Sequence, residues 1–234
     1  MVEKKFNKVL TAILIIILVS IFVILGFLAY NMFLRFHINS DANKAIDEFD
    51  NKIEELGVDE DNTELVESEG SEGESGEDSE SGGSGNSGGR GSSRRGTRYS
   101  SYSYKGFNVI GKIEIPKTKI KYPVFDVATI SSMQVSVGMV YGPGLNEIGN
   151  TVIMGHNYRN GTFFSNNNRI ANGDYIYITD AYGRRLRYRV YNTYITNSSD
   201  FDYATRDTNG KREISLASCT NDSKSRIIIW AREK

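Results

Sequence analysis

Residues 213–231 read EISLASCTNDSKSRIIIWA, and this stretch decides the fold class. Two runs rich in apolar and β-branched residues, 213–218 and 226–231, flank a short segment of Asn, Asp, Ser, Lys and Thr. Runs of this kind are typical of strands, and the polar residues between them favour a hairpin connection. Cys219 directly follows the first run and Arg226 opens the second. The sequence therefore predicts two strands that bring this cysteine and this arginine to one rim.

Six more runs of the same kind lie upstream, each bounded by Gly, Pro, Asn or Asp. They cover residues 109–115, 120–125, 135–141, 151–155, 175–179 and 185–195. Eight short strands with little helix fit a closed barrel or a sandwich. We therefore predict that residues 105–234 form an all-β module.

The N-terminal region predicts a membrane anchor. Residues 9–34 contain no charged side chain, and about 20 apolar residues are enough to cross the hydrocarbon core as a helix. Three lysines precede this run and Arg35 ends it, so the positive-inside rule places the N-terminus in the cytoplasm and the module outside. A cleaved signal peptide is the alternative, but the run is long for one and lacks a clear small-residue cleavage site. We expect an uncleaved signal anchor over residues 1–36.

Two further segments separate this anchor from the all-β module. In residues 37–57, apolar side chains recur at helical spacing, as at Ala42, Ile46 and Phe49, which predicts a short amphipathic stalk helix. Residues 58–104 are acidic at first and then rich in Gly, Ser and Arg, a composition that predicts a disordered tether. About 40 flexible residues reach about 35 Å, enough to hold the module away from a membrane.

The charge of the chain is divided unevenly. Residues 105–234 carry 18 Lys and Arg against 11 Asp and Glu, whereas the rest of the chain carries 10 against 18. A basic module prefers anionic surroundings, which fits a cell envelope or a nucleic acid. Because the predicted topology places the module outside the cell, we expect no nucleic acid among its partners.

The residues that could do chemistry are few. The module contains one cysteine and one histidine, too few soft ligands for a metal site, and the sequence predicts no metal or cofactor. His156 follows the apolar strand 151–155 as Cys219 follows 213–218, and Arg226 returns to the same rim. A thiol, an imidazole and a guanidinium suit acyl transfer as nucleophile, proton donor and oxyanion stabiliser. The alternative is structural, with Cys219 in the core, His156 in a turn and Arg226 on the surface.

Three segments of the module resemble the sortase family. The sequence SLASC at 215–219 is similar to the sortase signature Thr-Leu-x-Thr-Cys, and RIIIWA at 226–231 is similar to the strand that carries the family's arginine. The sequence GHNYRNGTFF at 155–164 resembles the histidine segment, most closely that of class B sortases. IEIP at 113–116 and YPV at 122–124 resemble the opening strands.

The resemblance implies an eight-stranded sortase-type barrel and a two-step reaction. Cys219 would attack a Thr-Gly-like bond in a C-terminal sorting motif and form a thioacyl enzyme, and His156 would protonate the departing amine. Arg226 would hold the substrate and its oxyanion, and Ser218 would offer a hydroxyl to the substrate. An amine of the cell wall or of another protein would then accept the protein.

The resemblance favours class B over class D. Class B sortases usually carry a long helical insertion before the cysteine strand, and here a short polar segment separates the last strands. Class C is disfavoured because no lid sequence of its kind precedes the barrel. The alternatives to a sortase are an extracytoplasmic cysteine peptidase without transfer and a tethered, wall-binding β-domain without enzymatic activity.

Overall fold

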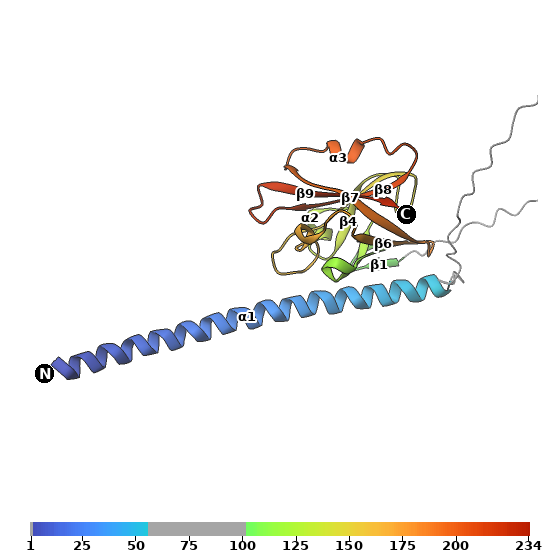
Figure 1. The fold of residues 1–234 in the computed structure, drawn as a ribbon. Coiled ribbons are helices and arrows are strands. Elements are labelled where there is room, and N and C mark those ends of the chain that lie inside the picture. Colours follow the sequence, from blue (N-terminus) through green and yellow to red (C-terminus); the bar gives the residue numbers. More distant parts are fainter. Residues whose placement is uncertain (1, 56–101) are drawn as a thin grey trace, which may run out of the picture.

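The computed structural model describes residues 2–55 and 102–234 (Figure 1). The predicted tether, 58–104, lies outside the described residues except for its last three, Tyr102–Tyr104, which form a strand. One long helix comes first, and the elements that follow it are strands with a few short helices between them. The elements are α1 (Val2–Glu55), β1 (Tyr102–Tyr104), β2 (Phe107–Ile115), η2 (Pro116–Thr118), β3 (Ile120–Phe125), α2 (Ile130–Met133), β4 (Val137–Tyr141), β5 (Gly149–Met154), η3 (Asn167–Arg169), β6 (Tyr175–Asp180), β7 (Arg185–Asn197), α3 (Asp202–Thr205), β8 (Arg212–Cys219) and β9 (Ser225–Glu233).

Eight of the described strands close into a barrel. Their order is β2-β3-β4-β5-β8-β9-β7-β6, and pairing of β2 with β6 completes the circle, while β1 adds a short edge to β2. The pairs β3–β4 and β5–β8 are parallel, and the other pairs are antiparallel. The prediction of an eight-stranded barrel is confirmed, and each predicted strand corresponds to one of β2–β9.

Inward-facing aliphatic side chains fill the barrel. Ile113, Val124, Ile153, Ile178 and Leu216 each have no exposed surface and belong to one contiguous core. Burial of a side chain of this size stabilises the folded state by about 1.5–3 kcal/mol. Because residues alternate between the two faces of a strand, this core also determines which residues of β5, β8 and β9 point outward.

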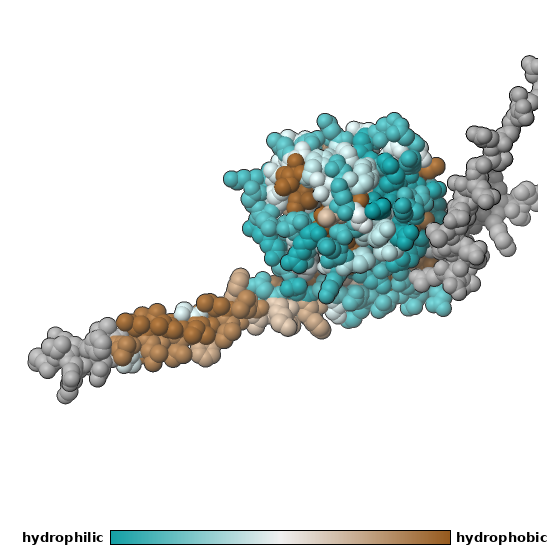
Figure 2. Space-filling view, in the orientation of Figure 1, coloured by the Kyte–Doolittle hydropathy of each residue, from teal (hydrophilic) through white to brown (hydrophobic). Residues whose placement is uncertain are grey.

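The first half of α1 is apolar on all sides and makes no core. Its large apolar side chains from Leu10 to Phe36 are exposed, and Figure 2 shows this stretch as a continuous hydrophobic rod. The helix is long and apolar enough to cross a membrane. A helix that is hydrophobic all round is stable where its surroundings are apolar too.

The second half of α1 packs on the barrel. Ala45, Phe49 and Ile53 are buried and form a cluster with Val109 and Phe125 of β2 and β3. The apolar spacing predicted an amphipathic helix here, and this face is the one that packs. The structure differs from the expected separate stalk, because these residues continue the same helix and cover the barrel.

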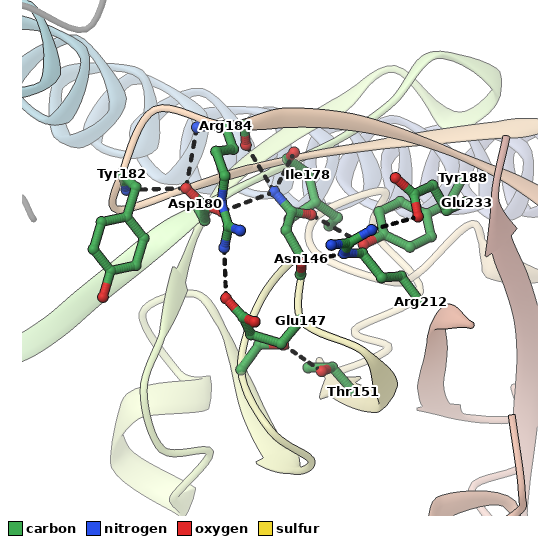
Figure 3. A network of polar contacts seen from close by, with 11 residues as sticks. Asn146, Glu147, Thr151, Ile178, Asp180, Tyr182, Arg184, Tyr188, Arg212 and Glu233 are labelled. Atoms are coloured by element: carbon green, nitrogen blue, oxygen red, sulfur yellow. Dashed lines mark hydrogen bonds and ion pairs between the residues drawn. The ribbon is translucent and has the colours of Figure 1, made fainter. Parts of the chain in front are cut away.

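The end of the barrel where β5 and β8 begin is closed by a polar network (Figure 3). The Asn146 amide donates to Asp180 Oδ2 at 3.2 Å and to the Arg184 carbonyl at 2.7 Å. Arg184 in turn pairs with Asp180 at 2.8 Å and Glu147 at 2.6 Å, and Arg212 Nε donates to the Asn146 carbonyl at 2.9 Å. The network joins the β4–β5 loop, the β6–β7 turn and the start of β8. We call it the far end.

Candidate active site

The strand register aligns the three predicted residues in one row. Cys219 at the end of β8 is directly opposite Arg226 at the start of β9. Directly opposite residues of an antiparallel pair have Cβ atoms about 4.5–5.5 Å apart and point to the same face. On the other side of β8, Ala217 is opposite Met154 of β5 in a parallel pair, and Gly155 N donates to the Ala217 carbonyl at 3.2 Å.

The parallel pair extends this row to the histidine. His156 lies two residues after Met154, and Cys219 lies two residues after Ala217. His156 and Cys219 therefore each lie two residues beyond the last pair of these two strands, at the same end of the barrel. The structure thus places Cys219 opposite Arg226, and the segment that begins with His156 contacts the end of β8 through Asn157. We call this end of the barrel the mouth, which comprises the row together with loops 157–163 and 220–224.

The Cys219 thiol lies on the outer face of the barrel wall. Leu216 faces the barrel core, whereas Ala217 packs in a second cluster outside it with Val152 and Ile228. Alternation along β8 places Cys219 on the same outer face as Ala217. Cys219 is half-buried and carries a free thiol. A partly exposed thiol at a strand end is held firmly and remains accessible to a substrate.

Ser218 does not join this row. It is 1 % exposed and, by the same alternation, faces the inside of the barrel. Its Oγ has no hydrogen-bond partner among the described residues. The Ser218 hydroxyl therefore lies on the opposite face of β8 from the Cys219 thiol. In this structure it is not exposed to a substrate that contacts Cys219.

The Arg226 guanidinium is held against the connection between β7 and β8. Its Nε donates to the Ser198 carbonyl at 3.0 Å, its Nη1 lies 3.7 Å from Met154 Sδ, and it stacks over Phe201 at 5.7 Å from the ring centre. Among the described residues, no carboxylate forms an ion pair with it. A guanidinium that is positioned but not neutralised is suited to an anionic group of a ligand.

Burial affects the His156 imidazole. The side chain is half-buried, and its ring centre lies 5.0 Å from that of Tyr158. Burial lowers the pKa of His156 below its ordinary value, because desolvation disfavours the charged ring. The neutral form is therefore favoured at neutral pH, and protonation requires a nearby negative charge or a lower pH.

Asn157 is a site residue that the sequence analysis did not single out. Its Nδ2 donates to the Cys219 carbonyl at 2.9 Å and to Asn221 Oδ1 at 3.0 Å. These bonds tie the residue after His156 to the strand end that carries the cysteine. The adjacent position in the segment GHNYRN was its only sequence signal, because an asparagine in a loop usually bonds its own backbone.

The short helix α3 covers the outer cluster beside the row. Tyr203 and Ala204 of α3 are buried against Ala217 and Ile228, and their carbonyls each accept from Asn150 Nδ2 at 2.9 Å. The segment after α3 is fixed by Arg206, which pairs with the buried Glu213 of β8. Hydrogen bonds from Tyr191, Arg206 and Arg232 lower the pKa of Glu213, against the upward effect of its burial.

Metal ligands do not gather in the part of the chain that the structure describes. No group of three or more His, Cys, Asp or Glu side chains in residues 2–55 and 102–234 could hold a metal ion.

Comparison with solved structures identifies the fold. Sortase A from Corynebacterium diphtheriae, in a lid mutant, matches with a TM-score of 0.50 and 27% identity over 54% of this chain and 70% of that chain. Another structure of sortase A from that organism matches with a TM-score of 0.50 and 27% identity, over 55% of this chain and 61% of that one. The lid mutant of Streptococcus agalactiae sortase C1 shares the fold with a TM-score of 0.50 and 20% identity, over 54% and 68%.

Comparison with protein families identifies the family. Residues 113–234 match the family model of the sortase domain, which is more than half of the chain. This chain therefore belongs to the sortase family of cysteine transpeptidases. The similar structures carry the names of different sortase classes, so they share the barrel and leave the class open. No curated protein matches the chain.

Proposed function

We propose that this protein is a membrane-anchored sortase that joins surface proteins to the cell wall. It would cleave a C-terminal sorting motif at a Thr-Gly-like bond and transfer the protein to an amine. The observation that supports the proposal is the register of β5, β8 and β9, in which Cys219 lies opposite Arg226 and His156 follows the strand that pairs with β8. These side chains come from two distant parts of the sequence, the segment after β5 and the β8–β9 hairpin.

In the first half of the reaction, the Cys219 thiolate attacks the carbonyl carbon of the scissile amide. A carbon–sulfur bond forms and the carbonyl oxygen becomes an oxyanion. The intermediate collapses when the carbon–nitrogen bond breaks, and the protonated ring of His156 gives its proton to the departing amine. The acyl group then remains on Cys219 as a thioester, and His156 is neutral.

Arg226 stabilises the oxyanion of this step in the proposal. Its guanidinium has no carboxylate partner among the described residues, so it is available to a developing negative charge. The Ser198 carbonyl and the Phe201 ring hold it in place before substrate arrives. A donor fixed in advance lowers the barrier because it does not reorganise during the reaction.

In the second half, the amine acceptor attacks the thioester carbonyl. A new carbon–nitrogen bond forms, the neutral imidazole of His156 takes a proton from the amine, and the Cys219 thiolate leaves. The enzyme thus returns to its starting protonation state, and no outside reductant or oxidant is needed. Water in place of the amine would give hydrolysis, so the acceptor decides between transferase and peptidase activity.

The proposed location is the cell membrane, with a single span and a cytoplasmic N-terminus. The exposed apolar half of α1 supports the span, and the three lysines before it support the orientation. The partners would be surface proteins with a C-terminal sorting motif and an amine-bearing precursor or subunit of the wall. The proposal includes no cofactor and no nucleic acid.

Within the family we propose class B over class D, on the strength of the histidine segment at 155–164. The connection between β7 and β8 departs from class B, because its only described helix is the four-residue α3. The motif that the enzyme accepts distinguishes the classes. A panel of sorting-motif peptides from both classes measures this directly.

The test of the proposal is transfer to an amine. The purified chain is incubated with sorting-motif peptides in the presence and absence of amine acceptors, and the products are separated by mass. We expect a new amide product that depends on the acceptor and disappears in Cys219→Ala. Cleavage that is indifferent to every acceptor would instead identify a peptidase, and no reaction in either case would leave a binding domain as the better account.

A further inference from the structure

The helix α1 contacts the barrel directly, beginning at the residues that follow its apolar half. The guanidinium of Arg35, the first charged residue after the apolar run, fills the space beside Gly161, where an added methyl carbon would lie 2.8 Å from Nη2. Ile38 packs on the barrel core, and the Tyr122 hydroxyl donates to Asn39 Oδ1 at 2.8 Å. At 1.5 Å per residue, these contacts begin within about 6 Å of the end of the apolar run.

The contact between α1 and the barrel continues for several turns. Lys112 of β2 has a side chain that is only 4% exposed, and its Nζ pairs with Asp50 Oδ1 at 2.6 Å. The Tyr102 hydroxyl donates to Glu48 Oε2 at 2.7 Å, and Phe49 is fully buried. A helix that is held by buried apolar contacts and by side-chain hydrogen bonds over several turns has one orientation on the barrel. Its direction therefore fixes the direction of the barrel.

The strand directions show which end of the barrel faces the apolar half of α1. β3 runs along α1 and away from that half, since Tyr122 lies beside Asn39 whereas Phe125 clusters with Phe49 and Ile53. β4 is parallel to β3, β5 is antiparallel to β4, and β8 is parallel to β5. Strands β5 and β8 therefore run back toward the apolar half, and the mouth is at their ends.

Direct contacts agree with this direction. Gly161, which touches Arg35, belongs to the loop that follows His156. In the same loop, Arg159 Nη2 donates to Ser223 Oγ at 2.8 Å, in the turn between β8 and β9. Figure 1 shows β9 starting on the side of the N-terminal half of α1 and the C-terminus lying on the opposite side.

The surface of the mouth has the side chains that occur at membrane–water interfaces. Tyr158 is 43 % exposed, Arg159 and Lys224 are exposed, and Phe36 on the adjacent turn of α1 is 72 % exposed. Tyrosine and basic residues are favoured at the level of the headgroups. The acidic Asp222 is also there, with its carboxylate bonded to Thr220 and to the backbone of the turn.

We propose that α1 is a fixed strut that seats the mouth of the barrel against the headgroup region of the membrane. The proposal rests on the membrane anchoring given under the proposed function. It implies that Cys219 meets only substrate segments presented at the membrane surface, and that the enzyme does not reach into the wall on a flexible tether. The partner of the mouth is thus the lipid surface itself.

The test measures the height of two positions above the membrane. In the full chain with Cys219→Ser, a single dye is attached through Lys224→Cys at the mouth or Lys211→Cys before β8. The eight residues of β8 separate these ends by about 25 Å. The proteins are placed in vesicles of phosphatidylcholine and phosphatidylglycerol with acceptor-labelled headgroups. We expect clearly stronger energy transfer from position 224, and equal transfer or stronger transfer from 211 would overturn the proposal.

A matched pair of insertions tests the strut. Six Gly/Ser residues inserted between Phe36 and His37 separate the span from the docked part of α1, and transfer from position 224 should fall. The same six residues inserted after Gly83 leave α1 intact, and transfer should not change. Loss in both variants or in neither would contradict the strut. Flotation of every variant with the vesicles reports anchoring separately, so its failure would sink the proposed anchoring as well.

Discussion

At the far end of the barrel, buried and half-buried polar groups are joined to one another, whereas at the mouth the reactive groups are left without strong partners. Asp180 is 3 % exposed and accepts from Arg184 and from two backbone N–H groups. Arg212 of the far end begins β8, and Cys219 ends the same strand about 25 Å away, opposite Arg226 of β9. Neither Cys219 nor Arg226 has an ionic partner among the described residues. The far end therefore holds the strands in register, and the mouth presents the reactive side chains that this register positions.

This division of roles predicts that substitutions at the mouth change the rate and leave the fold, whereas substitutions at the far end do the reverse. We expect this separation because activity depends on side chains that remain available to bind substrate. Stability depends instead on polar side chains whose hydrogen bonds and ion pairs are formed within the protein.

The largest effect is expected for Cys219→Ala. The substitution removes the nucleophile, so turnover of a sorting-motif peptide should fall by more than about 10⁴-fold. The melting temperature should stay within about 2 °C, because the thiol is half-buried and makes no hydrogen bond that the fold needs. Residual activity near that of the wild type would remove Cys219 from the mechanism.

Arg226→Ala should lower kcat/KM by about 10²–10³-fold, equivalent to about 3–4 kcal/mol of transition-state stabilisation. The matched control is Arg189→Ala, an exposed arginine of β7 toward the far end, which should change the rate less than about twofold. Arg226→Lys should recover part of the loss, since the charge remains but the paired donors do not. Equal losses at both arginines would indicate a general charge effect.

Asp180→Ala should lower the free energy of unfolding by about 2–4 kcal/mol, measured by urea titration. The carboxylate is the shared acceptor of the β6–β7 turn. Its loss removes the acceptor of two backbone N–H groups and of Arg184 Nε, and it removes one of the hydrogen bonds of the Asn146 amide. The exposed Asp47 of α1 supplies the control, with a change within about 0.5 kcal/mol for Asp47→Ala. A large fall in kcat/KM below the unfolding transition would contradict the separation of the two ends.

The smallest effect concerns pH. Burial lowers the pKa of His156, so the acid limb of the kcat/KM profile should bend below the ordinary histidine value of about 6.5. Below the pKa of His156 its ring is fully protonated. A further fall in pH then only lowers the fraction of thiolate, the form that attacks the substrate, so the rate declines. An inflection clearly above 6.5 would show that a negative group raises the pKa of His156 and outweighs its burial.

The sequence predicted the strands well, because their signal is local. Each predicted strand is a β-branched run bounded by turn residues, and 120–125 agrees with β3 to the residue. The three-residue β1 was not predicted, since its sequence YSY sits in a segment dominated by Gly, Ser and Arg. The pairing of Cys219 with Arg226 was predicted from their positions at the ends of two adjacent strands, and the pairing of β8 with β9 confirms it.

What the sequence could not show was long-range packing. The spacing of Ala45, Phe49 and Ile53 marks an apolar face, but it does not say what covers that face. The partner, around Val109 and Phe125, is more than 50 residues away and is defined only by the fold. The inward direction of Ser218 likewise depends on the register of β8, because one position along a strand reverses the face.

The measurement that tests the account most directly is intact-mass analysis of the chain after brief incubation with sorting-motif peptides, followed by peptide mapping. We expect an added acyl mass on Cys219 that an amine acceptor removes and that Cys219→Ala never forms. Amide product formed without any adduct on Cys219, or an adduct mapped to another residue, would contradict it.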